Sequence, residues 1–452
     1  MTPGADDSRS ADAGPAAWAA LAAAALALAL TALAFFGPIL GSAGSVGVFM
    51  DETQSVVVAL NFVTRLLYSI QPDKPYLGAF YPEMSIGLLS SLPSAIGWGA
   101  GGDLLAARLA SIAYCLGLWI AAAYLAMRTR AATDRWTALT IGCLVAAAGV
   151  LSCPDSAAIT MHAQGEISGG AWLAFGYLLL PSRPRLAALV LGLCVWHTKF
   201  IFLPFALAGM AWTTYAHASA LRERALLALQ LLAWFLVPLA AWMILIWLRI
   251  GADGFAEWAA RRFGWYGRGN SGLSGPPVVR GLAARLASPR LDWAGLFTLV
   301  KLRVLILLFA PVAVLATKVA RRWTAGRRDR GLDLLQSSLA LTLLAFAWWY
   351  FFWNQFMWVR HVEPALVVGF AVLAYDPARA VASLAPARRQ ALCALLAALM
   401  TVLVAADLPR AAAEWRDAVS TRSAPRSCSS PTPWQNGPWP QCMRLVSQPA
   451  RH

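Results

Sequence analysis

The sequence predicts an all-α, polytopic membrane protein, and three observations indicate this fold class. Hydrophobic residues make up 59% of the 452-residue chain, charged residues only 13%, and the mean hydropathy is +0.59. Globular domains carry roughly 25% charged residues, so the composition is far from theirs. Apolar runs long enough to cross a bilayer recur along most of the chain. Their Ala- and Leu-rich character argues against a barrel, whose strands would alternate over short segments.

About eleven apolar segments are candidates for transmembrane helices. The first follows a short, polar N-terminus that lacks the basic region of a secretory signal, so we expect it to stay in the protein as an uncleaved span. The predicted spans are 16–40, 104–127, 136–152, 167–181, 186–198, 200–215, 225–248, 296–317, 334–353, 362–375 and 390–406. They form one predicted transmembrane domain over 1–406, followed by a short tail over 407–452.

Loop charge sets the predicted orientation. With the N-terminus inside, the short loops on the same side carry clusters of Lys and Arg, whereas the short opposite loop 153–166 carries none. By the positive-inside rule, the N-terminus is predicted to be cytoplasmic and the C-terminus to lie outside. The net charge of +15 then fits basic loops that face anionic lipid, and it gives no reason to expect nucleic acid as a partner.

Three long segments are predicted on the outer face, and loops longer than about 12–15 residues are often functional. These segments are 41–103, 249–295 and the tail from Asp407. In the first loop, Asn61, Thr64 and Tyr68 share one face of a mostly apolar segment, which is typical of an amphipathic helix at the interface. We expect 77–98 to form a second juxtamembrane helix, because another span there would invert everything after it.

The tail holds two of the seven cysteines, Cys428 and Cys442, on either side of a Pro- and Trp-rich stretch. On an oxidising outer face they are candidates for a disulfide, and two unpaired thiols are the alternative. The other five cysteines lie in or at the ends of predicted spans without a CxxC motif. We interpret them as core residues and not as metal ligands.

Acidic and histidine side chains gather at the predicted outer ends of the spans. Asp51 and Glu52 follow the first span in "MDETQ", His162 and Glu166 precede the fourth in "MHAQGE", and His361 opens the tenth in "WVRHVEP". A carboxylate at such a place can act as a general base, although an Asp before a helix is also a common N-cap.

Basic side chains occupy the same predicted face. Lys74 lies in "QPDKPY", Lys199 in "WHTKF" and Arg360 beside His361. Such groups can hold a phosphate through charge-assisted hydrogen bonds, and snorkelling anchors are the alternative interpretation. In the 249–295 loop, Trp258, Trp265, Tyr266 and Arg268 either contact a sugar or headgroup or form an interfacial aromatic belt.

The span centres carry almost no charge. A proton- or ion-coupled transporter would be expected to have ionisable groups or broken helices near the midplane. The pattern therefore favours chemistry on a headgroup at the outer leaflet.

The order of these motifs resembles the GT-C superfamily of integral-membrane glycosyltransferases. The closest branch holds the lipid A aminoarabinose transferases and the protein O-mannosyltransferases. The matching elements are "MDETQ" after the first span, "DKP" in the same loop, "LGLCVWHTKF", and "VRHVEP" opening a late span. The resemblance covers roughly residues 30–215 well and the remainder weakly. Gln54 departs from the aminoarabinose branch, which has Arg at that place.

The resemblance implies a GT-C-like fold and transfer of a sugar from a polyprenyl-phosphate donor to a hydroxyl of a glycan, lipid or protein. It implies that Asp51 is the catalytic carboxylate supported by Glu52, and that Glu166 is a second acid. Lys74, Lys199 and Arg360 would bind the donor phosphate. The implied location is the bacterial inner membrane, with the active site on the periplasmic side.

No cofactor is predicted to be obligatory. Even so, Asp51, Glu52, Glu166, His162 and His361 would form a divalent metal site if they converge. Two other functions remain as alternatives: a flippase or transporter of lipid-linked saccharides, and an O-antigen-type polymerase or ligase.

Overall fold

The structure is a computed structural model. It describes residues 14–41, 58–64, 87–101, 104–131, 133–152, 165–267, 359–405 and parts of 306–320, 342–347 and 408–413. Within this part of the chain the regular structure is helical, and no β-strand occurs. This agrees with the predicted all-α class.

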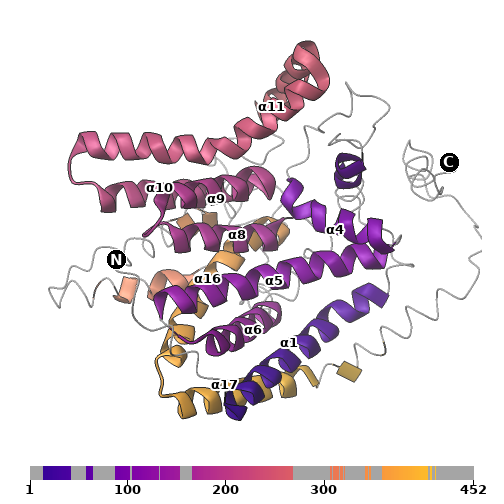
Figure 1. The fold of residues 1–452 in the computed structure, drawn as a ribbon, viewed down its shortest axis with the longest axis vertical. Helices are drawn as coiled ribbons and strands as arrows, with labels where there is room; N and C mark the ends of the chain where they lie inside the picture. Colours follow the sequence, from indigo (N-terminus) through magenta and orange to yellow (C-terminus); the bar gives the residue numbers. More distant parts are fainter. Residues whose placement is uncertain are drawn as a thin grey trace, which may run out of the picture.

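The principal helices pack side by side as a bundle (Figure 1). Their bounds are α1 Pro15–Gly41, α4 Leu88–Gly101, α5 Leu104–Arg130, α6 Arg135–Ser152, α8 Glu166–Leu179, α9 Pro184–His197, α10 Leu203–His217, α11 Leu221–Gly267, α16 Val359–Ala382 and α17 Pro386–Ala405.

Five of the described helices contain segments long and apolar enough to cross a membrane: Pro15–Gly37, Leu105–Thr129, Leu221–Ala260, Pro364–Ala382 and Pro386–Ala405. They support a membrane-embedded helical protein. The predicted spans 296–317 and 334–353 fall largely outside the described residues, so the predicted number of eleven stays a prediction.

Three central helices are short. Helices α8, α9 and α10 have 14, 14 and 15 residues. At 1.5 Å per residue each is about 21 Å long, which is less than the roughly 30 Å of a hydrocarbon core. Glu166 at the start of α8 and Thr198 at the end of α9 are both fully buried. These helix ends therefore stop inside the protein.

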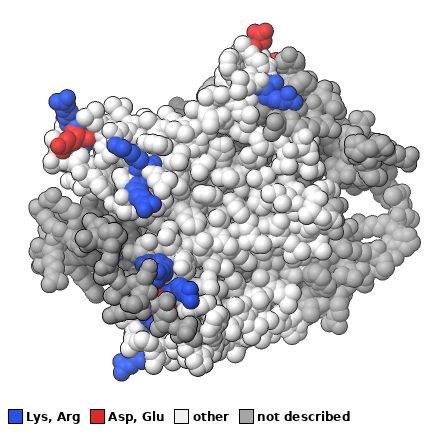
Figure 2. Space-filling view, viewed as in Figure 1, with Lys and Arg blue, Asp and Glu red and all other residues white. Residues whose placement is uncertain are grey.

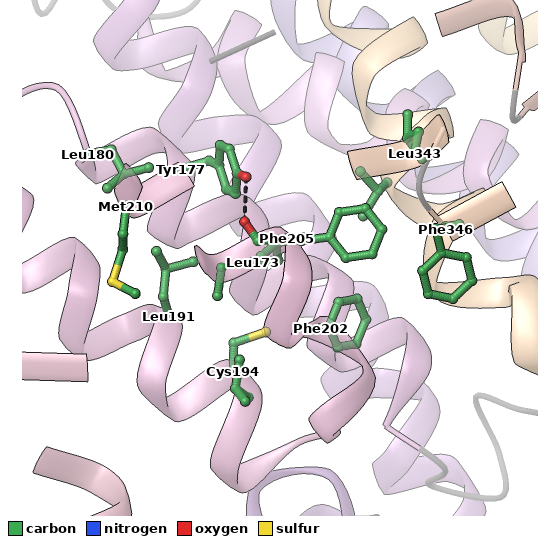
Figure 3. Close-up of a cluster of buried hydrophobic side chains, with 14 of the residues drawn as sticks. Leu173, Tyr177, Leu180, Leu191, Cys194, Phe202, Phe205, Met210, Leu343 and Phe346 are labelled. Carbon is green, nitrogen blue, oxygen red and sulfur yellow. Dashed lines mark hydrogen bonds between the residues drawn. The ribbon is translucent and has the colours of Figure 1, made fainter. Parts of the chain in front are cut away.

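Helices α8, α9 and α10 pack with α11, α16 and parts of 306–320 and 342–347 in the main hydrophobic core (Figure 3). Leu191, Phe202 and Phe205 are fully buried there, and the Tyr177 hydroxyl donates to the Phe205 carbonyl oxygen at 2.7 Å. Because this hydroxyl has a hydrogen-bond partner within the core, its burial leaves no donor unsatisfied. These helices therefore pack against one another up to the residues where they end.

The turns α5–α6, α8–α9, α10–α11 and α16–α17 lie at one end of the bundle. Trp18 of α1 packs on Trp136 of α6 with ring centroids 4.2 Å apart, and Arg389 of α17 pairs with Asp134 at 3.0 Å. In Figure 2 much of the visible Lys and Arg lies toward the left, the side of these turns, next to a broad band without charge. The orientation of these turns relative to a membrane stays a prediction.

Helix α11 extends beyond the predicted span 225–248. It runs to Gly267 with a kink at Gly251, whose backbone is left-handed at φ 75°. The terminal part beyond Gly251 carries Trp258, which packs with Ile246 and with Val58 of the helical segment 58–64. The helical segment 58–64 and the C-terminal part of α11 therefore meet.

Candidate functional site

Two residues predicted to have separate roles form an ion pair. The Lys199 ammonium donates a short hydrogen bond to the Glu166 carboxylate oxygen Oε1. The Glu166 side chain is 1% exposed and that of Lys199 is 16% exposed. The pair therefore lies inside the bundle, where a charge is retained only if it is compensated.

Gly165 determines how α8 begins. Its φ of 87° is left-handed, and a Cβ there would lie 2.9 Å from both the Ser90 hydroxyl and the Thr198 carbonyl oxygen. A glycine is therefore needed for the chain to turn into α8 in contact with α4 and the end of α9. This turn places Glu166 at the first position of α8.

Lys199 lies at a break between two helices. Its backbone is extended (φ −153°, ψ 129°), between the end of α9 and a single 3-10 turn, Phe200–Phe202, that leads into α10. A residue at such a break leaves the helical path. The Lys199 side chain thus reaches across to α8.

The backbone of this break is tied to α4. The Gly87 N–H donates to the Thr198 carbonyl oxygen at 2.7 Å, and the hydroxyls of Ser90 and Ser168 are hydrogen-bonded at 3.0 Å. A Cβ at Gly87 would lie 2.2 Å from the His197 backbone. Gly87 lies within the segment 41–103, directly before α4, so this segment contacts the bundle beside the ion pair.

Helix α11 supports the other side of the break. Trp196 Nε1 donates to the Phe235 carbonyl oxygen at 3.2 Å, and His197 Nε2 bonds the Pro238 carbonyl oxygen at 3.2 Å. Since a carbonyl only accepts, this geometry places the imidazole proton on Nε2. The edge of His197 also meets Trp242 at 5.5 Å between ring centroids. "WHTKF" therefore supplies both a partly buried lysine and the side chains that anchor it to α11.

Trp242 also contacts the first outer loop. Its ring lies 5.5 Å from that of Phe62, between centroids. The aromatic residue Trp258 is only 7% exposed and belongs to the same apolar cluster. Trp258 is therefore a packing residue, whereas the predicted sugar contacts Trp265 and Tyr266 lie farther along α11.

Most other predicted site residues lie outside what the structure describes. Asp51, Glu52, Lys74, His162 and Arg268 are in this group, as are Cys428 and Cys442 of the tail. For Arg360, His361, Trp265 and Tyr266 only the helical backbone is described, in the first turn of α16 and the last turn of α11. Their predicted roles are untested by the structure.

Arg108 is a candidate that the motifs did not single out. It lies near the start of α5 and is 3% exposed. At helical spacing it shares a face with Ser111 and Cys115, and Cys115 lies beside the Ser168 backbone of α8. A buried arginine requires anionic or polar partners. The signal in the sequence was one charge within the apolar stretch "LLAARLAS".

Two apolar cavities lie on the side of α8 that faces α5, α6 and α16. The larger, of about 180 Å³, is bounded by α5, α6, α8 and α16. The smaller, of about 40 Å³, also touches α1 and includes Ile167, the residue after Glu166. Trp119 and Val145 line both cavities. Neither Glu166 nor Lys199 lines either cavity.

Among the described residues, no group of three or more His, Cys, Asp or Glu side chains is placed to hold a metal ion. Four of the five predicted ligands of a divalent site are not among the described side chains. Metal dependence therefore stays a prediction.

No protein-family model, curated protein or solved structure matches the chain. The likeness to GT-C glycosyltransferases therefore depends on the order of the short motifs.

Proposed function

We propose that the chain is a GT-C-type glycosyltransferase of the cell envelope. It would transfer a sugar from a polyprenyl-phosphate donor to a hydroxyl group of a glycan, lipid or protein. The observation that carries the proposal is the buried Glu166–Lys199 pair, located at a helix break where the first outer loop returns to the bundle.

Lys199 is suited to a leaving phosphate. Its ammonium is recessed in an environment of low dielectric constant, where a charge-assisted hydrogen bond to an anion is stronger than in water. Glu166 keeps this cation compensated and directed before donor binds. In the proposed reaction Lys199, with Lys74 and Arg360, stabilises the negative charge that develops on the departing phosphate.

The bond changes follow from the donor chemistry. The acceptor oxygen forms a bond to the anomeric carbon, and the bond between that carbon and the phosphate oxygen breaks with its electron pair on the phosphate. Asp51 takes the proton of the acceptor hydroxyl, and Glu52 supports it. Basic side chains supply the electrostatic stabilisation in this proposal, so no obligatory metal is assigned.

One observation favours transport of a lipid-linked saccharide as a second candidate. An ionisable pair inside the bundle, next to the interrupted helices α9 and α10, is a feature that transporters also use. It weakens the argument from the sequence that charge is confined to the outer face.

The test uses the full-length chain in proteoliposomes, with radiolabelled polyprenyl-phosphate sugars and candidate acceptors. We expect product formation that is lost in Asp51→Asn, while donor binding is retained. Lys199→Ala is expected to weaken donor binding at least tenfold. Movement of the donor between leaflets without any glycosylated product would overturn the proposal in favour of transport.

Lys318→Ala is the matched control for Lys199→Ala. Lys318 also forms a close ion pair, with Asp376 of α16, but near the opposite end of the bundle. A general requirement for paired lysines would affect both variants equally. A phosphate role for Lys199 leaves donor binding by the Lys318 variant unchanged.

A further inference from the structure

We propose that the basic turn between α5 and α6 binds the phosphate group of an anionic phospholipid from the surrounding bilayer. The basic turn is defined here as residues 128–136 together with Arg389 of α17. It lies at the end of the bundle opposite to the Glu166–Lys199 pair, and none of its residues has a role in the proposed transfer reaction. The inference is therefore independent of the proposed function.

Three guanidinium groups meet at the basic turn. Arg128 Nη1 donates to a backbone carbonyl oxygen of the turn at 2.6 Å, and Arg389 Nη2 donates to the Asp134 carboxylate at 3.0 Å. The Arg135 guanidinium lies over the Trp136 ring, 4.8 Å from its centroid. Among the described residues of the turn, Asp134 supplies the only carboxylate. Positive charge is therefore in excess at this place.

The basic turn also has buried polar atoms that lack partners. Trp136 Nε1 and Arg389 Nε can only donate, and neither has a hydrogen-bond partner among the described residues. The hydroxyl of Thr133, a residue only 4% exposed, likewise has none within that part of the chain. Buried polar groups in native proteins are nearly always hydrogen-bonded. A turn with surplus donors and surplus positive charge is complementary to an oxygen-rich anion such as a phosphate.

The basic turn lies where a lipid headgroup would be. Arg128 is at the end of the candidate membrane span in α5, and Arg389 is in the first turn of the candidate span α17. Trp18, near the start of the candidate span in α1, packs on Trp136. Tryptophan at the ends of spans is typical of the membrane interface, where basic side chains attract anionic lipids. The ends of three candidate spans thus converge on the turn.

Apolar surfaces lead away from the basic turn along α1 and α17. These helices pack against each other, and both begin at this end of the bundle (Figure 1). Leu26 and Leu33 of α1 and Leu395 and Leu399 of α17 are each more than half exposed. Their spacings of seven and four residues keep each pair on one helix face. Acyl chains would cover these faces, which a soluble phosphate would not contact, so a bilayer phospholipid is the ligand that fits.

The test removes two arginines and leaves the Arg389–Asp134 ion pair in place. The delipidated full-length protein is titrated in detergent with dioleoyl phosphatidylglycerol or dioleoyl phosphatidylcholine, and bound lipid is measured by native mass spectrometry. We expect the unaltered protein to prefer phosphatidylglycerol. Arg128→Gln/Arg135→Gln should weaken this lipid at least about tenfold, because each arginine near an anionic headgroup contributes to its binding. Binding of phosphatidylcholine should change less than about twofold.

Arg222→Gln/Arg224→Gln is the matched control. It removes the same charge at the start of α11, at the same end of the bundle, and Arg224 also lies over an aromatic ring, 4.7 Å from the centroid of Tyr215. The control should change the affinity for phosphatidylglycerol less than about twofold. Equal losses in the two double variants would overturn the inference, because they would indicate a diffuse attraction to anionic lipid. Equal affinities of the unaltered protein for the two lipids would also overturn it.

Arg135→Gln alone keeps the inference testable if the double variant does not fold, because Arg135 is exposed. We expect it to weaken phosphatidylglycerol about threefold. An unchanged affinity in this variant would overturn the inference. Millimolar inorganic phosphate, added as a competitor, should leave the lipid bound. Displacement of the lipid would assign the turn to a soluble phosphate and overturn the assignment to a phospholipid.

Discussion

Glu166 and Lys199 lie on different helical segments, 33 residues apart, and each compensates the charge of the other inside the bundle. Removing one partner of a buried pair leaves an uncompensated charge, which is usually more harmful than removing both. The contribution of the pair to the free energy of unfolding can therefore be measured separately from any role in catalysis.

At this scale we predict that Glu166→Gln lowers the free energy of unfolding by about 1–3 kcal/mol, because the partly buried Lys199 charge loses its carboxylate partner. Equilibrium unfolding in mixed micelles measures this loss. The double variant Glu166→Gln/Lys199→Met should recover much of the stability and should not recover transfer activity. Glu223→Gln, at an exposed glutamate of α11, is the control and should have little effect. A double variant no more stable than Glu166→Gln alone would contradict the electrostatic account.

Asp134 provides a prediction on pH dependence. Partial burial opposes its charge, but hydrogen bonds from Thr137 and the nearby Arg389 guanidinium outweigh this effect, so the pKa of the Asp134 carboxyl is lowered. The Thr137 N–H donates to Oδ1 at 2.9 Å, which makes Asp134 an N-cap of α6.

A lowered pKa in the folded state means that the unfolded chain binds more protons as the solution is acidified. The contribution of Asp134 to stability is therefore present above its ordinary pKa of about 3.9 and is lost as the pH falls toward the lowered pKa. We expect Asp134→Asn to reduce the acid-dependent decrease in melting temperature below about pH 4. Identical pH profiles for the two proteins would show that this carboxyl is not coupled to folding.

At the scale of elements, the contact between α9 and α11 holds the Lys199 break in place. Gly192 of α9 approaches α11 so closely that a Cβ would lie 2.2 Å from the Phe235 carbonyl oxygen. The nearby hydrogen bonds of Trp196 and His197 go to carbonyl groups of the same stretch of α11. A shift between these helices would therefore displace Lys199 as well.

We expect Gly192→Ala to destabilise the protein by about 1–3 kcal/mol, as overpacking generally does. Thermal unfolding in detergent measures the effect. Gly117→Ala on α5 is the matched control, because a Cβ there meets nothing within 4 Å. Its higher helix propensity should be neutral or stabilising by up to about 1 kcal/mol. Equal melting temperatures for the two variants would mean that α9 can move away from α11 without a loss of folding stability.

The whole molecule has two different ends. One end gathers the α5–α6, α8–α9 and α16–α17 turns with most of the described Arg side chains, and the other carries α4 and the ion pair. The charge bias predicts that the first end is cytoplasmic.

Cysteine labelling in intact cells tests this orientation. In a background without Cys153, Cys428 and Cys442, Ser182→Cys and Ser383→Cys should react with a membrane-impermeant maleimide only after permeabilisation. Gly99→Cys on α4 should react in intact, outer-membrane-permeable cells. All three positions are exposed in the structure. Labelling of Ser182→Cys before permeabilisation would invert the topology and place Lys199 on the cytoplasmic side.

The helical class and several spans could be predicted from the sequence because the length and hydrophobicity of a segment are local properties. The predicted spans 16–40 and 104–127 both correspond to helices long and apolar enough to cross a membrane. The full length of α11 could not be predicted in this way, because Gly251 allows a kink and a second helical part that packs on the first outer loop.

The sequence by itself determined that this is an apolar, helical, membrane-type chain, and it proposed Glu166 and Lys199 as separate candidates. Only the tertiary structure decided that these two residues pair, that Arg108 is buried, and that apolar cavities lie between α8 and the helices α5, α6 and α16. The physical reason is that these relations depend on where the short helices α8 and α9 stop and on the close glycine contacts that bring them to α4 and α11. Neither helix ends nor contacts between distant segments are encoded in the local periodicity of the chain.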